Sequence, residues 1–313
     1  MCETVLGPVH EVTLRAVADL GMAQVSRAET VELCRRALAG REATLGPKHL
    51  STLNSISNLA RRLVHMSSTD ATNYATSASA TAGTAAARQL ILGQPKKTTL
   101  ADQTNLEEAV ALYRRALKGM EETVGPKHKL ALAVLCNLAV LEKKLGNAEE
   151  SKSLYQRALL GQEETLGPRH PDTLACVSRL GSMLRFEGKL VEAESMMRRS
   201  LEGNEVTRGP KHKVTLTALG NLADLLMQQG RLVESEPLFR RSLAGHEELY
   251  GPMHQTVLRT CMQFGGLLFQ QRKYAESQRY LERAADGLVA VLGPNSREAK
   301  AAVYNRDAIR RFL

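Results

Sequence analysis

Eight histidines are the residues of this 313-residue chain most suited to metal or acid–base chemistry. Six of them follow a proline by two residues and recur with an internal period: His10, His49, His128, His170, His212 and His254. Repeats stacked at roughly one helix diameter, about 10 Å, keep these imidazoles too far apart to share a zinc ion, whose ligands lie within about 2 Å of the metal. We therefore expect each of them to cap or orient the helix that follows it.

Three other patterns look catalytic at first sight. The segment from His246 to Tyr250 begins like the HExxH zinc motif, but tyrosine stands where the second histidine ligand belongs. Residues 181–189 have the wrong spacing for a phosphate-binding loop, and Cys34 takes a place that a buried aromatic residue, Tyr155, fills in another repeat. The sequence shows no catalytic constellation, so we predict no enzymatic activity and no metal or cofactor.

A polar column is the more promising functional signal. One equivalent position in successive repeats, directly before a large apolar residue, is occupied by Asn58, Asn137, Arg179, Asn221 and Gln263. One or two helical turns away, on the same predicted face, lie Arg61, Lys144, Ser182, Asp224 and Arg259. An amide can pair with the backbone of an extended peptide through both its donor and its acceptor, and a cation favours acidic ligand groups. The alternative is that these amides bond to neighbouring helices and hold the array together.

The elements that position this column are repeated helical hairpins. Glycine–proline pairs begin at Gly7, Gly46, Gly125, Gly167, Gly209, Gly251 and Gly293, and the last five are 42 residues apart. Glycine in the left-handed C′ position followed by proline ends a helix. Before each pair, large and small residues recur at i, i+4 spacing, and after each Gly-Pro-x-His a second helix carries a leucine and a large–small pair such as Leu138-Ala139. Short polar turns such as Leu145-Gly146-Asn147 join the two helices.

This pattern resembles the tetratricopeptide repeat, and LYQRALLGQEETLGPRHPDTLACVSRL at 154–180 is similar to the 42-residue form found in kinesin light chains and nephrocystin-3. The resemblance implies an all-α fold, a right-handed superhelical α-solenoid of tetratricopeptide-type helical hairpins. It also implies that the polar column faces a concave groove. We expect one solenoid over 1–313, with repeats at 11–46, 49–125, 128–167, 170–209, 212–251 and 254–293, and a polar C-terminal capping helix at 296–312.

Two features depart from the family. Gly46 and Gly125 are 79 residues apart, 37 more than the repeat, which predicts an insertion at about 67–104 between the two helices of the second hairpin. Within residues 67–87, 17 of 21 are Ala, Ser or Thr, too little large apolar surface to offset chain entropy, so we expect disorder there. A local alanine-rich helix near 85–92 and an error in the gene model are the alternatives. The chain also lacks the N-terminal coiled coil of kinesin light chains and opens on the end of a hairpin, which suggests a fragment or an unusual start.

Composition narrows the functional classes. No apolar run is long enough for a membrane span, five scattered cysteines form no CxxC pair, and no secretory signal is visible, so a cytoplasmic protein is expected. The net charge of +9 favours acidic partners. Arginine pairs such as Arg114-Arg115 and Arg240-Arg241 lie near glutamates and are expected to form a solvated, ion-paired face.

The function that the sequence favours is a protein–protein interaction scaffold. The scaffold would bind an extended, partly acidic peptide segment in its groove, as a kinesin-light-chain-like adaptor for cargo or motor-associated proteins. Neither nucleic-acid binding nor membrane insertion is expected, and the oligomeric state stays open. Two alternatives remain: an electrostatic binder of RNA or of an anionic membrane surface, and the sensor array of a larger NTPase-type signalling protein.

Overall fold

The computed structural model describes residues 27–67, 100–310 and 312, and over these ranges every regular element is an α-helix. The helices are α3 (Arg27–Leu45), α4 (Leu50–Ser67), α7 (Leu100–Thr123), α8 (Lys129–Leu145), α9 (Ala148–Thr165), α10 (Pro171–Phe186), α11 (Leu190–Arg208), α12 (Lys213–Gln228), α13 (Leu232–Tyr250), α14 (Gln255–Gln270), α15 (Tyr274–Leu292) and α16 (Arg297–Ile309). The chain divides into two compact units, described at 27–67 with 100–176 and at 177–312, so the division falls within α10. The predicted all-α array of helical hairpins is confirmed.

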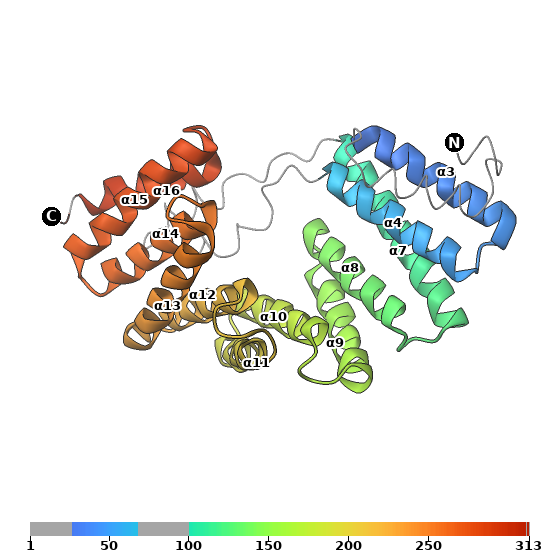
Figure 1. The fold of residues 1–313 in the computed structure, drawn as a ribbon, viewed down its shortest axis with the longest axis horizontal. Helices are drawn as coiled ribbons and strands as arrows, with labels where there is room; N and C mark the ends of the chain where they lie inside the picture. Colours follow the sequence, from blue (N-terminus) through green and yellow to red (C-terminus); the bar gives the residue numbers. More distant parts are fainter. Residues whose placement is uncertain (1–26, 68–99, 311, 313) are drawn as a thin grey trace. The chain divides into compact units, whose positions relative to one another are not determined.

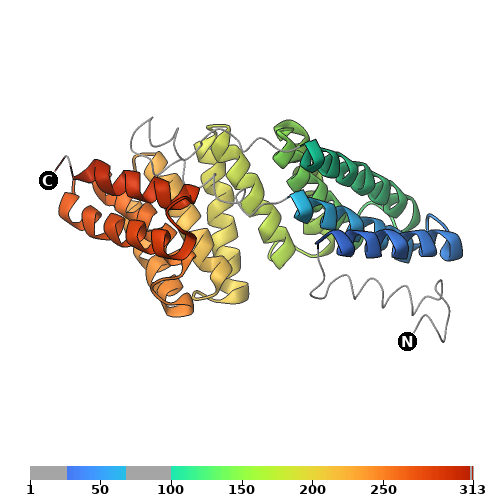
Figure 2. The same cartoon turned by 90° about the horizontal axis from the view of Figure 1, so that it is seen from above.

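Each unit is built from helices packed in chain order (Figure 1). In the first unit α4 pairs with α7 and α8 pairs with α9, while α3 packs on α4. In the second unit α12 pairs with α13, α14 pairs with α15, and α16 packs on α15. Figure 2 shows these paired helices running side by side within each unit. We call α4, α8, α10, α12 and α14 the first helices of their hairpins, and α7, α9, α11, α13 and α15 the second helices.

The Gly-Pro pairs end the second helices, as predicted, but in a different conformation. Gly209 has φ 90° and ψ 162°, which is an extended conformation that only glycine adopts, and not the left-handed helical C′ geometry expected. The cause is the following proline, whose ring disfavours helical ψ in the residue before it. The left-handed cap occurs instead at the turn inside the hairpin, where Gly146 has φ 91° and ψ 1°.

The histidines after these pairs are N-caps, which confirms that prediction. In all five that the structure describes, the imidazole Nδ1 accepts a hydrogen bond from the backbone N–H two residues later, at 3.2 to 3.3 Å: His49, His128, His170, His212 and His254. His10 lies outside the described residues. Each cap satisfies one of the N–H groups that the first turn of a helix leaves without a partner.

Replacing His212 with alanine should lower the free energy of unfolding by about 1 kcal/mol, because the N–H of Val214 loses its acceptor. Urea denaturation of the two proteins measures this loss. His212→Asn offers a side-chain oxygen in the same place and should keep most of the stability. Equal losses in the two variants would mean that the imidazole acts by packing and not by capping.

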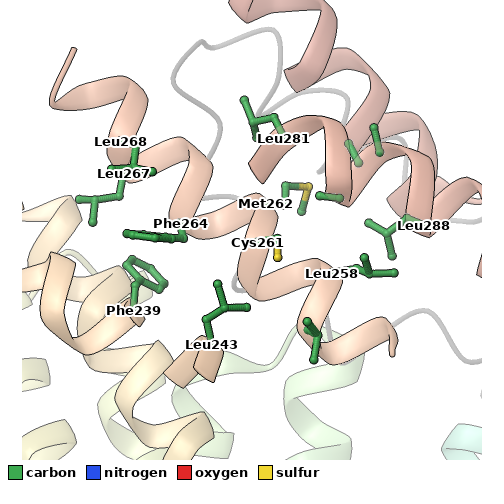
Figure 3. Close-up of a cluster of buried hydrophobic side chains, with 14 of the residues drawn as sticks. Phe239, Leu243, Leu258, Cys261, Met262, Phe264, Leu267, Leu268, Leu281 and Leu288 are labelled. Carbon is green, nitrogen blue, oxygen red and sulfur yellow. The ribbon is translucent and has the colours of Figure 1, made fainter. Parts of the chain in front are cut away.

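The small residues predicted at close helix contacts lie where the two helices of a hairpin meet. The hydroxyl Oγ of Ser151, Ser235 and Ser277 each donates at 2.7 Å to a main-chain carbonyl of the first helix. The acceptors belong to the small residues of the large–small pairs, for example Gly265 for Ser277. Around these contacts lies an apolar core, drawn for α13 to α15 in Figure 3, where Phe239, Phe264 and Leu281 are buried.

The arginines of the second helices form ion pairs, and most of these pairs link neighbouring hairpins. Arg157 binds Glu121, 36 residues earlier, whereas Arg115 binds Glu42 at 2.5 Å, 73 residues earlier. We call this series of arginine–glutamate pairs between successive second helices the ion-pair ladder. The difference of 37 residues equals the excess length of the second repeat, so the same positions pair on both sides of the insertion. The predicted ion-paired face is therefore confirmed, with the partners in adjacent hairpins more often than within one helix.

Helix α16 packs on α15 and occupies the place of the predicted capping helix. Ser296 stands where the other repeats have histidine, and its Oγ accepts from the N–H of Ala299 at 3.1 Å. Arg306 occupies the place that Phe264 fills in the hairpin before, and it binds Asp307 and Asp286. Charged side chains thus replace the apolar surface on which a further second helix would pack.

The insertion is shorter than predicted at one end. Residues 100–104, which we assigned to it, form the start of α7, with Asp102 in the first turn where an acidic residue favours a helix. Residues 68–99, and with them the predicted disorder and the alternative helix at 85–92, lie outside the described residues. So does the first helix of the first repeat, within residues 1–26. In the part that the structure covers, no helix combines the length and apolar character needed to cross a bilayer.

Candidate functional site

The predicted ligand contacts lie on the first helices, and we describe them separately in the two units. In the first unit α4 and α8 touch each other, so equivalent positions on the two helices lie on the same side. Asn58 and Asn137 are both exposed there, although the apolar residue after each of them is buried. This alternation places the two amides at the edge of the core with their side chains toward solvent.

The cationic members of the first unit lie on the same helices. Arg61 is exposed, and its Nη2 donates to Oδ1 of Asn58 at 2.8 Å. Lys144 is half-buried, and this burial lowers the pKa of its ammonium group. Two of the four predicted residues in this unit therefore bind each other, and an incoming ligand would have to share or displace that bond.

The second unit holds the remaining predicted residues with graded exposure. Arg179 is exposed, while Ser182, Asn221 and Gln263 are partly buried. Arg259 is largely covered, with 14% of its side chain exposed, and its Nε donates to Glu298 of the capping helix at 3.1 Å. Here the capping helix supplies an acidic partner that we had expected from a ligand.

Asp224 corrects the predicted site. Its side chain is fully buried, and Oδ2 accepts from Nη1 of Arg185 at 2.8 Å. Burial raises the pKa of this carboxyl, while the Arg185 guanidinium opposes the rise. Asp224 is thus not available for direct contact with a ligand, because the arginine of the preceding hairpin reaches over it.

A second buried carboxylate was missed by sequence analysis. Glu142 on α8 is 1% exposed and accepts from Arg114 Nη2 at 2.9 Å and from Asn147 Nδ2 at 2.7 Å. Its equivalents in the later hairpins are leucines: Leu184, Leu226 and Leu268. A carboxylate at a position that is otherwise leucine was the available signal.

We call the side of the first helices that carries the predicted ligand contacts the first-helix face. The burial of Glu142 and Asp224 determines the charge of this face. On α4, α8, α12, α14 and residues 177–186 of α10, the acidic residues are Glu142 and Asp224, and both are buried and neutralised by arginine. The exposed polar side chains of these helices are amides, hydroxyls and cations. On α4 and α8, and on the first helices of the second unit, the face therefore offers hydrogen-bond donors and positive charge without an exposed carboxylate, whereas Asp172 in the first turn of α10 is exposed.

No metal site emerges from the described part of the chain. No group of three or more histidine, cysteine, aspartate or glutamate side chains in it is arranged to hold a metal ion. The capping histidines each bind their own helix, and Cys34, Cys136, Cys176 and Cys261 are free thiols. Cys34 is buried, as expected for a packing residue.

Comparison with known proteins identifies the repeat. The family model for the tetratricopeptide repeat matches residues 96–159, 130–205, 173–248 and 214–288, which together cover more than half of the chain. The chain is a tetratricopeptide repeat protein. Members of this family are in general protein-interaction scaffolds that bind proteins or peptides and not enzymes.

Solved structures share the fold of this tetratricopeptide repeat protein at low sequence identity. One is a putative kinesin light chain with nearly identical TPR-like repeats from Podosopora anserina, at 21% identity and a TM-score of 0.57, covering 77% of this chain and 97% of that one. Another is BtubC (BKLC) from P. vanneervenii, at 17% identity and a TM-score of 0.62, with coverages of 90% and 92%. PilF of Pseudomonas aeruginosa aligns at 16% identity and a TM-score of 0.55, with coverages of 92% and 95%. No curated protein sequence matches the chain.

Proposed function

We propose that this tetratricopeptide repeat protein is a non-enzymatic adaptor that binds an extended, partly acidic peptide segment along the first helices of its hairpins. The observation that carries the proposal is the first-helix face of the first unit. There Asn58 and Asn137 are exposed on touching helices, and the one carboxylate of those helices, Glu142, is buried. Exposed amides can pair with a peptide backbone whatever its side chains, and the surrounding cations select acidic ones.

A kinesin-light-chain-like role is the finer part of the proposal. It is supported by the 42-residue repeat and by the fold shared with a putative kinesin light chain. Cargo or motor-associated proteins would then be the source of the peptide. We infer a cytoplasmic setting from the free thiols and the scattered spacing of the cysteines.

The proposal predicts that Asn58→Ala combined with Asn137→Ala weakens peptide binding about tenfold, since each lost hydrogen bond contributes about 0.5 to 1.5 kcal/mol. The probe is a fluorescein-labelled library of extended peptides with Glu and Asp at alternate positions, measured by fluorescence anisotropy with the full chain. The melting temperature should stay within a few degrees of the wild type, because both amides are exposed.

Asn147 provides the matched control. Its amide is used inside the protein, where it donates to Glu142, so Asn147→Ala should lower stability and leave peptide affinity nearly unchanged. If the Asn58 and Asn137 double variant loses stability and not affinity, the amides hold the array together and the proposal fails.

Salt dependence separates this proposal from electrostatic binding of RNA or an anionic membrane. Binding to phosphates weakens steeply with rising salt, and it would be indifferent to the loss of two neutral amides. The described ion-pair ladder already neutralises many arginines of the second helices, for example Arg157 with Glu121 and Arg241 with Glu205. This leaves the amide-bearing face as the favoured site.

A further inference from the structure

The junction between α13 and α14 carries a column of three aromatic rings. His246 stacks on Tyr250 with ring centroids 6.0 Å apart, and Tyr250 stacks on His254 at 4.4 Å. His254 is also the N-cap of α14, where its Nδ1 accepts from the N–H of Thr256 at 3.2 Å. We call His246, Tyr250 and His254 the imidazole column.

The column occurs at one of the repeat junctions that the structure describes. The other described junctions have at these three positions Arg41, Leu45 and His49; Met120, Val124 and His128; Gln162, Leu166 and His170; Asn204, Arg208 and His212; and Leu288, Leu292 and Ser296. None of them has a second imidazole or a tyrosine between. The α13–α14 junction therefore has two imidazoles where each of the others has at most one.

His246 needs to be neutral in the closed structure. Its side chain is 3% exposed, and Nδ1 lies 3.4 Å from Oγ of Ser242, which donates to the carbonyl of Leu216. Burial, with a smaller electrostatic contribution from His254, lowers the pKa of His246 to about 4. Among the described residues, no carboxylate forms a hydrogen bond or an ion pair with this ring.

The charged groups around the column are already paired. On α13, Glu247 binds Arg283 of α15 at 2.5 Å and Glu248 binds Lys211, which precedes α12, at 2.7 Å. Arg283 also donates to the carbonyl of Pro252, in the loop between Tyr250 and His254. A cation on His254 would gain from the face of Tyr250, but it would lose the Thr256 hydrogen bond and stand at the positive end of a helix.

We propose that the imidazole column is an acid-sensitive latch: protonation of the buried His246 disrupts the ring stack, releases the first turn of α14 and loosens α14, α15 and α16 from α13. The direction of the pH dependence follows because the closed form requires His246 to be neutral. A histidine whose pKa is lowered by folding contributes full stability above its unfolded value of about 6.5, and this stability is lost as the pH falls toward the folded value. The latch is thus closed at neutral pH and opens between about pH 6.5 and pH 4.

Hydrogen exchange of the full chain tests the latch. At pH 5, the opening equilibrium of the first turn of α14, residues 255–258, should rise about tenfold more than that of the first turn of α12, residues 213–216, after correction for intrinsic rates. Residues 213–216 of α12 are the internal reference, because they follow an equivalent capping histidine, His212, at a junction that has no imidazole column.

Variants drawn from the other repeats isolate the column. His246→Leu copies Leu288, and His254→Asn keeps an acceptor for the N–H of Thr256 while removing the second imidazole of the column. The double variant should lose the excess opening at pH 5, whereas His212→Asn should leave it unchanged. His246→Asn, which copies Asn204, replaces the leucine variant should that one fold poorly. Equal acid sensitivity of α12 and α14 in the wild type, or an unchanged excess in the double variant, would overturn the proposal.

Discussion

Replacing Arg185 with methionine should lower the free energy of unfolding by about 3 to 5 kcal/mol at pH 7. The change leaves Asp224 fully buried without its counter-ion, and Oδ1 of this carboxylate already has no hydrogen-bond partner. Methionine fits the position, because Met227 occupies it in the next hairpin. Urea denaturation followed by circular dichroism measures the loss.

The pH dependence of the Arg185→Met variant gives a second check. Burial raises the pKa of Asp224, and without the arginine the pKa should rise further. A carboxyl with a raised pKa contributes stability below its unfolded value, and this stability is lost as the pH rises through the folded value. The deficit of the variant should therefore be larger at pH 7 than at pH 5.

The double variant Arg185→Met with Asp224→Val tests whether the pair or its burial matters. Valine stands at the equivalent position in α8, as Val140, so the double variant removes both charges and keeps an apolar fit. It should recover most of the stability lost in the single variant. A double variant as unstable as the single one would show that the cost arises from packing around Arg185.

Leu216→Ala should lower the free energy of unfolding by about 2 to 5 kcal/mol, and it should reverse the effect of adding a methyl group at Gly245. Leu216 is 1% exposed on α12, and a Cβ at Gly245 of α13 would lie 2.4 Å from its Cδ2. Gly245→Ala alone is therefore expected to destabilise by about 1 to 3 kcal/mol. With Leu216 shortened, the same change fills the vacated space and improves helix propensity, so it should stabilise by about 1 kcal/mol.

A double-mutant cycle on thermal and urea unfolding measures this reversal. Leu258 and Gly287 in the last hairpin have the same geometry, with a Cβ contact at 2.4 Å, and should give the same sign change. Simple additivity at both places would mean that the close contact stores no strain and that the leucine packs elsewhere.

Much of the fold could be predicted because its signals are periodic and local. The Gly-Pro pairs, the histidine two residues after each proline and the small residues at close contacts each act within one hairpin, and a 42-residue period repeats the evidence. The conformation of Gly209 could not be inferred from a general rule for helix ends, since the proline after it changes the permitted ψ. The start of α7 at Leu100 was also missed, because composition does not mark where a polar stretch becomes helical.

The candidate site was harder to predict because its members depend on the neighbouring hairpin. Asp224 lies on the expected side of α12, yet Arg185 of α10 covers it. Arg259 lies on the expected side of α14, yet Glu298 of α16 binds it. Helical spacing places a residue on a face, but it does not tell which long side chain from an adjacent helix crosses that face. By contrast, Asn58 and Asn137 remain exposed, although Arg61 of the same helix binds Asn58.

The ion-pair ladder also bears on how such a chain can change in length during evolution. In the second unit Arg198 approaches Glu234 and Arg240 approaches Glu276, so each second helix presents the same donor to its successor and the same acceptor to its predecessor. Loss of one whole module by unequal recombination would bring Arg198 opposite Glu276, so a positive and a negative side chain would still face each other at the new junction. Selection could thus lengthen or shorten the array one module at a time without redesigning either neighbour.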